Sequence, residues 1–364
     1  MTTLFDRFYQ GKTIFVTGHT GFQGSWLSLW LTLLGAKVIG YSLPPPTNPS
    51  LFDSLKIKKN IVNNIQDINN KDKLFSILSK YNPDMVIHLA AQSLVRKSYE
   101  LPLETFTTNV IGTANLLDSI RDIPSVKSCI VMTSDKAYEN KEWDYAYREN
   151  DPMGGHDPYS ASKGAAELIV SSYRRSFYNK KNSPGIASVR AGNVIGGGDW
   201  SQDRLIPDCI RSLQSNKKIT LRNPKSIRPW QYVLESLSGL LLIGSKLSKN
   251  SQRFGRAWNI GPMTTNDISV KSIVEKIIKK WGSGTINIKR NNLHEAKYLR
   301  LDSSNIANIL KWKPTYNIEE SITETVKWYV ANDSNNKLIH DYTVSQIEDY
   351  VSAAKKSENT WVHK

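Results

Sequence analysis

A glycine-rich loop between a short apolar strand and a helix limits the possible folds of this chain more than any other feature. Segment 13–17, TIFVT, is apolar and β-branched, and it leads into TGHTGFQG, which contains Gly18, Gly21 and Gly24. Glycine lets the backbone approach a pyrophosphate closely, and the N-terminus of the next helix supplies N–H donors and a favourable dipole. A tight turn alone would also use glycine, but the strand–loop–helix order favours a dinucleotide site.

The same alternation of strand-like and helix-like segments continues through the first half of the chain. Apolar β-branched runs predict strands, and periodic runs between them predict helices. The expected strands are 37–43, 61–68, 85–91, 128–134 and 185–192, and the expected helices are 24–34, 71–81 and 105–123. Nearly continuous apolar strands separated by helices indicate a parallel sheet covered on both faces. We therefore expect an α/β protein with a doubly wound parallel sheet.

The rhythm loosens after about Asn193, where VIGGGDW and RNPKSIRPWQYV predict a smaller mixed α/β lobe. We expect the sheet domain over 1–192, with later segments returning to it. A mainly substrate-binding lobe is expected over 193–350, and 351–364 is expected to be a poorly ordered C-terminal tail.

The charge balance is strongly positive, with 48 Lys and Arg against 33 Asp and Glu, a formal net charge of +15. Nucleic acid could be attracted by such a charge, but the lysines are scattered. No arginine-rich arm, zinc-ligand pattern or aromatic RNA-binding motif accompanies them. We expect no nucleic-acid partner and no metal, and part of the positive charge would serve an anionic small substrate.

Membrane and export signals are not apparent in the sequence. Apolar runs such as 26–34 are too short to cross a bilayer, and the N-terminus lacks an apolar signal core. Only two cysteines occur, and Cys129 lies in an apolar strand pattern, so a disulfide framework is not expected. A reducing cytoplasm fits this composition.

Tyr159 and Lys163 form a YSASK motif, in which four-residue spacing puts both side chains on one helix face. A lysine ammonium near a phenol lowers the phenol pKa from about 10, so that the phenolate can accept a proton. This motif is common by chance, but here it follows a turn-forming HDP, a glycine loop and several strands. That order favours a catalytic pair.

Ser134, Asp135 and Lys136 follow an apolar strand directly. The carboxyl end of a strand in a doubly wound sheet faces the ligand crevice. An ordinary turn would also place polar groups there, but a serine hydroxyl can hold a sugar oxygen, and an adjacent acid and amine can supply an acid and a base. Lys136 can act as a base only when neutral, a state favoured by desolvation or by the charge of Lys163.

These motifs resemble those of nucleotide-sugar dehydratases in the extended short-chain dehydrogenase/reductase superfamily. Ser134-Asp135-Lys136 occupies the position where dTDP-glucose 4,6-dehydratases carry Thr-Asp-Glu, and TSDK is similar to CDP-glucose 4,6-dehydratases. The resemblance covers nearly the whole chain, including RAGNVIGGGDW and DPMGGHDPYSASKG. Ala137 and Ala161 depart from the cysteine and asparagine of that family, and neither departure affects an obvious chemical duty.

The resemblance implies a Rossmann fold, bound NAD, a CDP-sugar substrate and a cytoplasmic homo-oligomer, dimer or tetramer. It also implies deoxysugar biosynthesis for a surface polysaccharide such as a lipopolysaccharide O-antigen. The implied catalytic residues are Ser134, Asp135, Lys136, Tyr159 and Lys163. The implied cofactor contacts are Gly18, Thr20, Gly21, Phe22, Gln23, Gly24, Ser42, Asp67, Ile68, Ala90, Gln92, Tyr159 and Lys163. The implied substrate contacts are Arg96, Tyr99, Asn193, Arg204, Arg228, His294 and Tyr298.

Two of these residues leave the cofactor open. The second strand of such a fold normally ends in an acid that holds the ribose hydroxyls of NAD. Ser42 occupies that place here, so NADP stays an alternative. Asp67, at the end of the third strand, is either an adenine-side acceptor or a strand-end cap.

The implied reaction is dehydration of CDP-glucose to CDP-4-keto-6-deoxy-glucose with internal hydride transfer, which makes the enzyme a lyase. Tyr159 would remove the proton of the 4-hydroxyl, Lys136 the proton of C5, and Asp135 would protonate the departing 6-hydroxyl. An epimerase or reductase of the same superfamily is the alternative, although neither needs an adjacent acid–base couple. A regulatory dinucleotide-binding protein is a third possibility, but it would not need to retain Tyr159 and Lys163.

Overall fold

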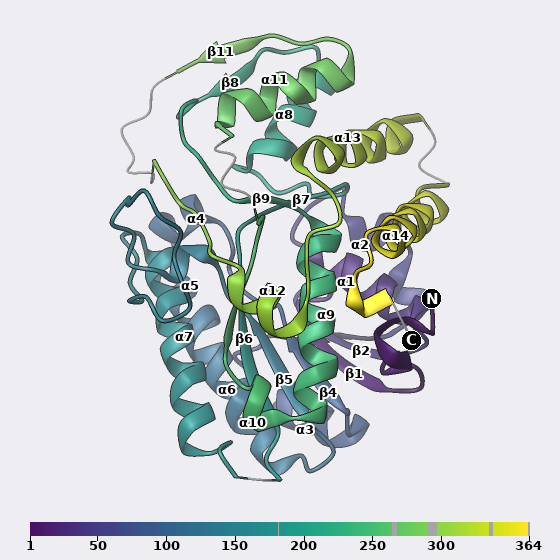
Figure 1. Cartoon of the computed structure of the whole chain (residues 1–364), viewed down its shortest axis with the longest axis vertical. Helices are drawn as coiled ribbons and strands as arrows, with labels where there is room; N and C mark the ends of the chain where they lie inside the picture. Colours follow the sequence, from purple (N-terminus) through teal and green to yellow (C-terminus); the bar gives the residue numbers. More distant parts are fainter. Residues whose placement is uncertain (181, 264–267, 290–296, 335–337, 363–364) are drawn as a thin grey trace.

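The computed structural model describes residues 1–180, 182–263, 268–289, 297–334 and 338–362. Seven parallel strands form a central sheet in the order β3-β2-β1-β4-β5-β6-β10 (Figure 1). The strands are β1 (Thr13–Thr17), β2 (Lys37–Ser42), β3 (Val62–Ile65), β4 (Met85–His88), β5 (Ser128–Met132), β6 (Gly185–Ala191) and β10 (Ala257–Ile260). The strand order reverses between β1 and β4, which opens a ligand crevice at their carboxyl ends. The expected doubly wound parallel sheet is confirmed.

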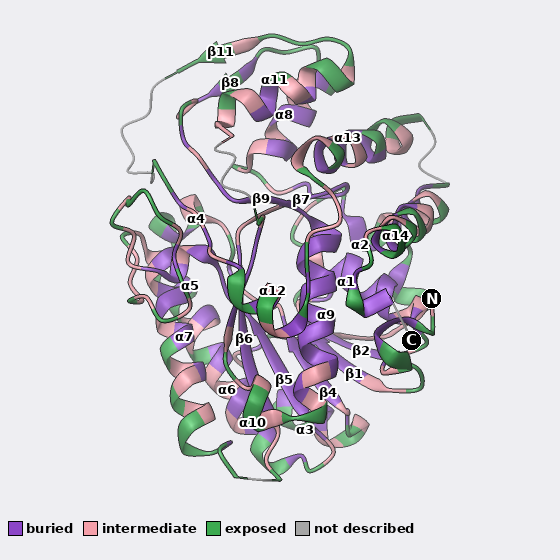
Figure 2. Cartoon of the chain, viewed as in Figure 1, coloured by how far each residue is buried: buried purple, intermediate pink, exposed green. Residues whose placement is uncertain are grey.

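Alternation of side chains along the strands divides the apolar core into two clusters, one on each face of the sheet. Ile14 and Val16 of β1 belong to one cluster, and Phe15 between them belongs to the other. The first face is covered by α1 (Phe22–Leu33) and α9 (Val233–Lys249), and the second by α3 (Lys71–Tyr81), α6 (Gly112–Ser119) and α7 (Pro158–Ser176). The inner strands β1, β4, β5 and β6 are buried along almost their whole length because helices cover both faces, whereas the edge strand β3 is only partly buried (Figure 2).

The segment 105–123 is not the single helix that its pattern predicts. It is divided among α5 (Pro102–Phe106), a π-helical turn η3 (Thr107–Ile111), α6 and a 3-10 turn η4 (Ile120–Asp122). The side chain of Asn109, within the π turn, accepts from the backbone N–H of Gln92 (2.8 Å) and donates to its carbonyl (3.0 Å). The π turn thus places the Asn109 side chain for two tertiary hydrogen bonds with the backbone of Gln92.

A second lobe lies over the carboxyl edge of the sheet, at the top of Figure 1. It contains two small parallel pairs, β7 with β9 and β8 with β11, and three helices. The elements are β7 (Asn193–Ile195), α8 (Leu205–Gln214), β8 (Ile219–Leu221), β9 (Trp230–Tyr232), α11 (Val270–Trp281), β11 (Ile286–Ile288) and α13 (Ile318–Ser334). Strand β7 begins two residues after β6 ends, so it leads directly from the sheet into the lobe. The boundary at residue 193 stays a proposal.

The described part of the C-terminal segment packs against the protein, in contrast to the poorly ordered tail that its polar composition predicts. Helix α14 (Ile339–Lys356) continues past 351, and Trp361 is only 1% exposed. Its ring stacks at 5.1 Å on Phe5 and at 5.8 Å on Tyr350. The burial of one indole outweighs the polar residues around it. Within the described ranges, no helix has the length and apolar character that crossing a bilayer requires.

Candidate active site

A cavity of about 830 Å³ lies where the carboxyl ends of the strands meet the second lobe. Many of the residues singled out in the sequence line it: Gln23, Arg96, Tyr99, Ser134, Asp135, Lys136, Tyr159, Lys163, Asn193, Arg204 and Arg228. The fold thus brings together side chains from across some 200 positions of sequence. This is the crevice in which doubly wound sheets bind ligands.

Ser134 links the two ends of the polar segment that follows β5. It caps a 3-10 turn, η5 (Asp135–Ala137), by accepting from the N–H of Lys136 at 3.2 Å, and its hydroxyl donates to Asp135 Oδ1 at 2.9 Å. Ser134 and Tyr159 line the same cavity, where the serine hydroxyl acts to lower the pKa of the phenol. The phenol, the hydroxyl, the carboxyl and the Lys136 amine therefore border one cavity.

Asp135 is suited to hold a proton. Its side chain is 2% exposed, and its Oδ2 has no hydrogen-bond partner among the described residues. Burial raises the pKa of Asp135, although the charges of Lys136 and Arg228 and the Ser134 hydrogen bond oppose the rise. A carboxyl in this state favours the protonated form and can act as a general acid.

Tyr159 and Lys163 lie on α7, which begins at Pro158 after Asp157 caps it by accepting from the Ser160 N–H (2.9 Å). Burial raises the pKa of Tyr159 to about 12, while Ser134 and Arg204 act to lower it. The expectation of a lowered phenol pKa is wrong for this structure. For Tyr159 burial outweighs the nearby positive charge of Arg204. For Lys163 burial outweighs the negative charge of Glu167 and lowers the pKa of the amine to about 8.

The Lys163 amine donates to the carbonyl of Met132 at 3.4 Å. Nearby is a buried histidine, His88, that the sequence patterns did not single out. His88 Nδ1 contacts Thr17 Oγ1 at 2.7 Å, and its Nε2 contacts Thr113 Oγ1 at 3.1 Å. Burial, together with the charge of Lys163, lowers the pKa of His88 to about 3, so the imidazole is neutral. His88 was hidden in an apolar strand pattern, and nothing in that pattern distinguishes it from core.

The glycine loop has the close packing that a dinucleotide site needs. Gly18 has φ +73°, and a Cβ there would meet the backbone N of Ala90 at 2.6 Å. A Cβ on Gly24 would meet the Gly18 carbonyl oxygen at 2.1 Å, whereas on Gly21 it would meet only that oxygen, at 3.4 Å. The outer side of the loop is therefore open, and the first turn of α1 has no side-chain cap. The backbone N–H groups of this first turn can therefore bind a pyrophosphate.

The neighbouring expected contacts are less uniform. Ser42 bonds to Thr20 Oγ1 at 2.9 Å, and the Thr20 hydroxyl donates to the Leu43 carbonyl. Asp67 is exposed, and its Oδ1 accepts from the N–H of Asn69 at 2.9 Å, as a strand-end cap does.

The other expected cofactor residues have structural contacts as well. Ile68 is buried and packs against Gly112, and Phe22 lies near Gly196. The side-chain amide of Gln92 already has hydrogen-bond partners within the protein, because it donates to Thr105 Oγ1 at 2.9 Å and to the Leu94 carbonyl.

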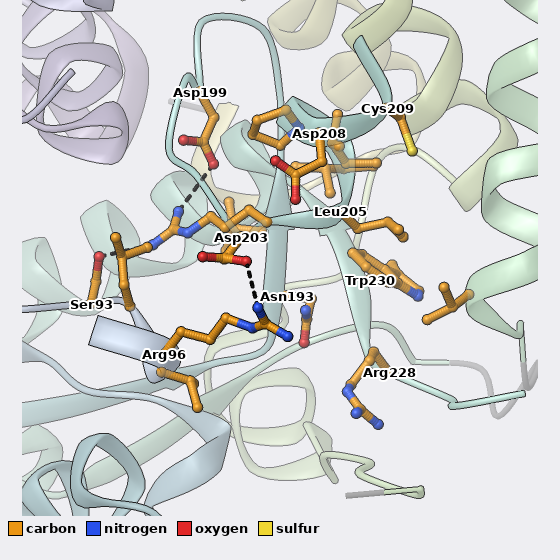
Figure 3. Close-up of a pocket in the computed structure, with 18 of the residues that line it drawn as sticks. Ser93, Arg96, Asn193, Asp199, Asp203, Leu205, Asp208, Cys209, Arg228 and Trp230 are labelled. Atoms are coloured by element: carbon orange, nitrogen blue, oxygen red, sulfur yellow. Dashed lines mark hydrogen bonds and ion pairs between the residues drawn. The ribbon is translucent and has the colours of Figure 1, made fainter. Parts of the chain in front are cut away.

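Guanidinium groups and carboxylates alternate at the substrate end of the cavity (Figure 3). Arg204 donates to Asp199 Oδ2 at 3.0 Å and to Ser93 Oγ at 2.9 Å. Arg96 NH1 lies 3.3 Å from Asp203 Oδ1. These arginines can exchange a carboxylate for a diphosphate oxygen, because both anions suit the guanidinium fork.

The remaining expected substrate residues divide into three groups. Arg228 is buried and donates to the Ile227 carbonyl at 2.8 Å, while Asn193 and the half-exposed Tyr99 line the same cavity. Tyr298 is not among the cavity-lining residues described, and His294 lies outside the described residues.

Arg222 also lines the cavity, 2.8 Å from Asp203, and was not anticipated. It belongs to the same RNPKSIRPWQ segment as Arg228 but carries no distinguishing spacing.

Known proteins match this chain along most of its length. The family model described as GDP-mannose 4,6 dehydratase matches residues 15–325. CDP-glucose 4,6-dehydratase of Salmonella typhimurium strain LT2 is 47% identical over 355 residues, covering 96% of this chain and 99% of that protein.

Two solved structures resemble the fold. The dTDP-glucose 4,6-dehydratase of Bacillus anthracis, in complex with NAD, has a TM-score of 0.74 at 23% identity and covers 89% of this chain and 98% of that one. UDP-glucose 4-epimerase of Thermotoga maritima, with UDP-glucose, has a TM-score of 0.76 at 20% identity and covers 89% and 100%. At such identities these two likenesses show the fold alone.

Proposed function

The chain belongs to the GDP-mannose 4,6-dehydratase family, and on that premise we propose that it dehydrates CDP-glucose to CDP-4-keto-6-deoxy-glucose. The choice of CDP-glucose is supported by the 47% identity to a protein of that activity. The reaction is a lyase reaction without net oxidation, and its product is a precursor of deoxysugars such as those of surface polysaccharides.

One observation supports dehydration over epimerisation. The couple Asp135–Lys136 lines the same cavity as Tyr159, and Ser134, which lines it too, donates to the carboxyl of Asp135. An epimerase needs only the phenol and the hydride acceptor. An acid and an amine beside the phenol have a use when water must leave the neighbouring carbon.

Each residue then has a distinct task. Ser134 holds the O4 oxygen of the hexose, and Tyr159, once it has lost its own proton, removes the proton of the 4-hydroxyl. The resulting ketone acidifies C5–H, and neutral Lys136 accepts that proton. Asp135, whose pKa burial raises, passes a proton to the departing 6-hydroxyl, which leaves as water. A proton is finally returned to C5.

We propose NAD as the cofactor, which supplies hydride acceptance from C4 and hydride return to C6 when bound. The open outer side of Gly21 and the uncapped first turn of α1 are the places that would hold its pyrophosphate. Gln23, in the first turn of α1, lines the cavity and would contact the cofactor.

An activity panel tests this function. CDP-, dTDP-, GDP- and UDP-glucose are each incubated with NAD or NADP, and the 4-keto product is measured by its absorbance in alkali. We expect product with CDP-glucose and NAD at a kcat/KM above that of every other pair. A purified protein that epimerises or reduces a nucleotide sugar, without forming 4-keto product, would contradict the proposal.

We also propose that the enzyme is a cytoplasmic homo-oligomer. Both cysteines are free and buried, as expected in a reducing compartment. Large apolar side chains are exposed along α5, η3 and α7, where Leu103 is 78%, Ile111 52% and Leu168 62% exposed. Contiguous exposed apolar surface is typical of a protein interface, and the occupant we propose is the same face of a second copy.

The assembly is tested with Leu103→Asp, because a charge at the centre of such a face cannot be buried without a partner. We expect analytical ultracentrifugation to show smaller particles for this variant than for the wild type. Val330→Asp is the matched control, since Val330 is 45% exposed on α13, away from that face. A monomeric wild type, or equal assembly in both variants, would show that this face is not the interface.

A further inference from the structure

A buried ion pair lies beneath the segment Ser134–Asp135–Lys136, the catalytic turn, and the proposed mechanism does not use this pair. Arg190 Nη2 donates to Glu167 Oε2 at 2.8 Å, and the two side chains are only 5% and 4% exposed. Glu167 lies on α7, four residues after Lys163, and therefore on the same helix face as the catalytic pair. Arg190 comes from β6, beside the strand that ends in the catalytic turn.

Glu167 holds the residue that precedes the catalytic turn. Thr133 Oγ1 donates to Glu167 Oε1 at 2.5 Å, and the next residue is Ser134. The other carboxylate oxygen, Oε2, accepts from Ser188 Oγ at 2.8 Å in addition to Arg190. Both oxygens of this buried carboxylate are thus occupied.

Arg190 holds the residue that follows the turn. Its NH1 donates to the Tyr138 hydroxyl at 2.8 Å, and its guanidinium lies 4.8 Å from the centre of the Tyr138 ring. Tyr138 directly follows Ala137, the last residue of η5. Its hydroxyl donates in turn to Asn259 Oδ1 at 2.7 Å. The turn is therefore held at both ends by one ion pair.

We propose that Glu167 and Arg190 are positioning residues, which fix the Ser134–Asp135–Lys136 turn against the helix that carries Tyr159 and Lys163. The inference rests on the proposed function, because it assigns the pair to the geometry of elimination. Oxidation at C4 and elimination across C5 and C6 require two sets of groups around a single hexose. A misplacement of about 1 Å between such groups can cost on the order of 100-fold in rate.

The charges of the pair are stable in this environment. Burial alone would raise the pKa of Glu167, but Arg190 and the hydroxyls of Thr133 and Ser188 hold it below its ordinary value. Glu167 also faces Lys163, where its negative charge partly offsets the effect of burial on the amine. An ionised Glu167 accepts from all three of its donors, Thr133, Ser188 and Arg190, whereas a protonated one would lose the charge that pairs with Arg190.

Two matched substitutions separate positioning from general stability. Thr133→Val and Ser188→Ala each remove one hydroxyl that donates to Glu167, but only Thr133 is adjacent to the catalytic turn. We expect similar losses of thermal stability in both. Thr133→Val should lower kcat by about 10- to 100-fold with little change in KM. Ser188→Ala should keep the wild-type kcat, and Thr133→Ser, which restores a hydroxyl, should recover most of the rate.

A readout of the separate steps sharpens the test. Because the turn carries the acid and the base of elimination, Thr133→Val should accumulate reduced nicotinamide during turnover and exchange C5–H with deuterated solvent more slowly. A merely structural role predicts neither change. If Thr133→Val does not fold, Tyr138→Phe removes the contact at the other end of the turn and must show the same loss of kcat.

The outcomes are distinct. Equal kcat in Thr133→Val and Ser188→Ala, or a normal kcat in Tyr138→Phe, would overturn this inference while leaving an active dehydratase. A wild type that acts on no nucleotide sugar would overturn the proposed function and this inference together.

Discussion

Two buried carboxyl groups, one among the reacting groups and one in the layer beneath them, have pKa values shifted in opposite directions. Asp135 borders the cavity with one oxygen unpaired among the described residues, and burial raises its pKa. Glu167, one layer down, has both oxygens bonded and a guanidinium beside it, and its pKa is lowered. The comparison teaches that a missing partner keeps a proton available for chemistry, whereas complete pairing gives a rigid support.

The largest expected effect comes from substitutions among the reacting groups. Asp135→Asn removes the acid but keeps the shape, so we expect overall turnover to fall by about 10²- to 10⁴-fold. Oxidation should persist, because Tyr159 is untouched. Stopped-flow absorbance should therefore show reduced nicotinamide that is not reoxidised.

Tyr159→Phe is the matched comparison, since it removes the phenol that starts the reaction. It should suppress the absorbance change and the product alike. Normal dehydration by Asp135→Asn would rule out the role of the carboxyl and remove the contrast between the two layers.

The next largest effect is on the stability of the protein and comes from the layer beneath the reacting groups, formed by Glu167 and Arg190. Arg190→Met leaves the buried charge of Glu167 without its hydrogen-bonded cation, and we expect the free energy of unfolding to fall by about 3–5 kcal/mol. Urea denaturation followed by circular dichroism measures it. The double variant Arg190→Met with Glu167→Gln should recover part of the loss, because no uncompensated charge remains. Additive losses would mean that the two side chains do not form an energetic pair.

Glu235 provides a third case and a smaller effect. It is buried and accepts from the N–H groups of Thr315 (2.9 Å) and Tyr316 (2.7 Å) and from the Tyr350 hydroxyl (2.8 Å), but none of these partners is a cation. Burial raises its pKa from 4.5 to about 7. As pH rises between these values, the unfolded chain loses the proton first, and the folded state loses up to about 3 kcal/mol of stability.

Glu235→Gln should remove this slope while keeping an acceptor oxygen for the two N–H groups. Denaturation at about pH 5 and about pH 8 compares the two proteins, and the wild type should weaken more at the higher pH. An equal slope in both would show that neutral donors suffice to keep a buried carboxylate ionised, and the distinction drawn between Glu167 and Asp135 would need another cause.

Sequence patterns predicted the sheet and the residues at its carboxyl edge well. Parallel strands end at a common edge, so a polar group directly after a strand, such as Ser134, reveals its place in the crevice. The strand pattern also gave β1 to β6 to within a few residues at their ends.

The supporting groups could not be predicted in the same way. Glu167 and Arg190 are 23 positions apart, and each is an ordinary residue in its own element. Asn109 contacts Gln92 only because a π turn interrupts a helix whose pattern is regular. The prediction of a lowered pKa for the Tyr159 phenol was wrong for a related reason. Burial raises this pKa, and burial depends on the whole fold and not on the spacing of Tyr159 and Lys163.

The stacking of Trp361 on Phe5 has a consequence for biosynthesis. Residues near the start of the sequence complete their packing only against an indole made more than 350 residues later. Domains fold as units while the ribosome delivers the chain from the N-terminus. The first face of the sheet must therefore keep part of its apolar surface uncovered until Trp361 has been synthesised, which is the stage when a chaperone would be of most use.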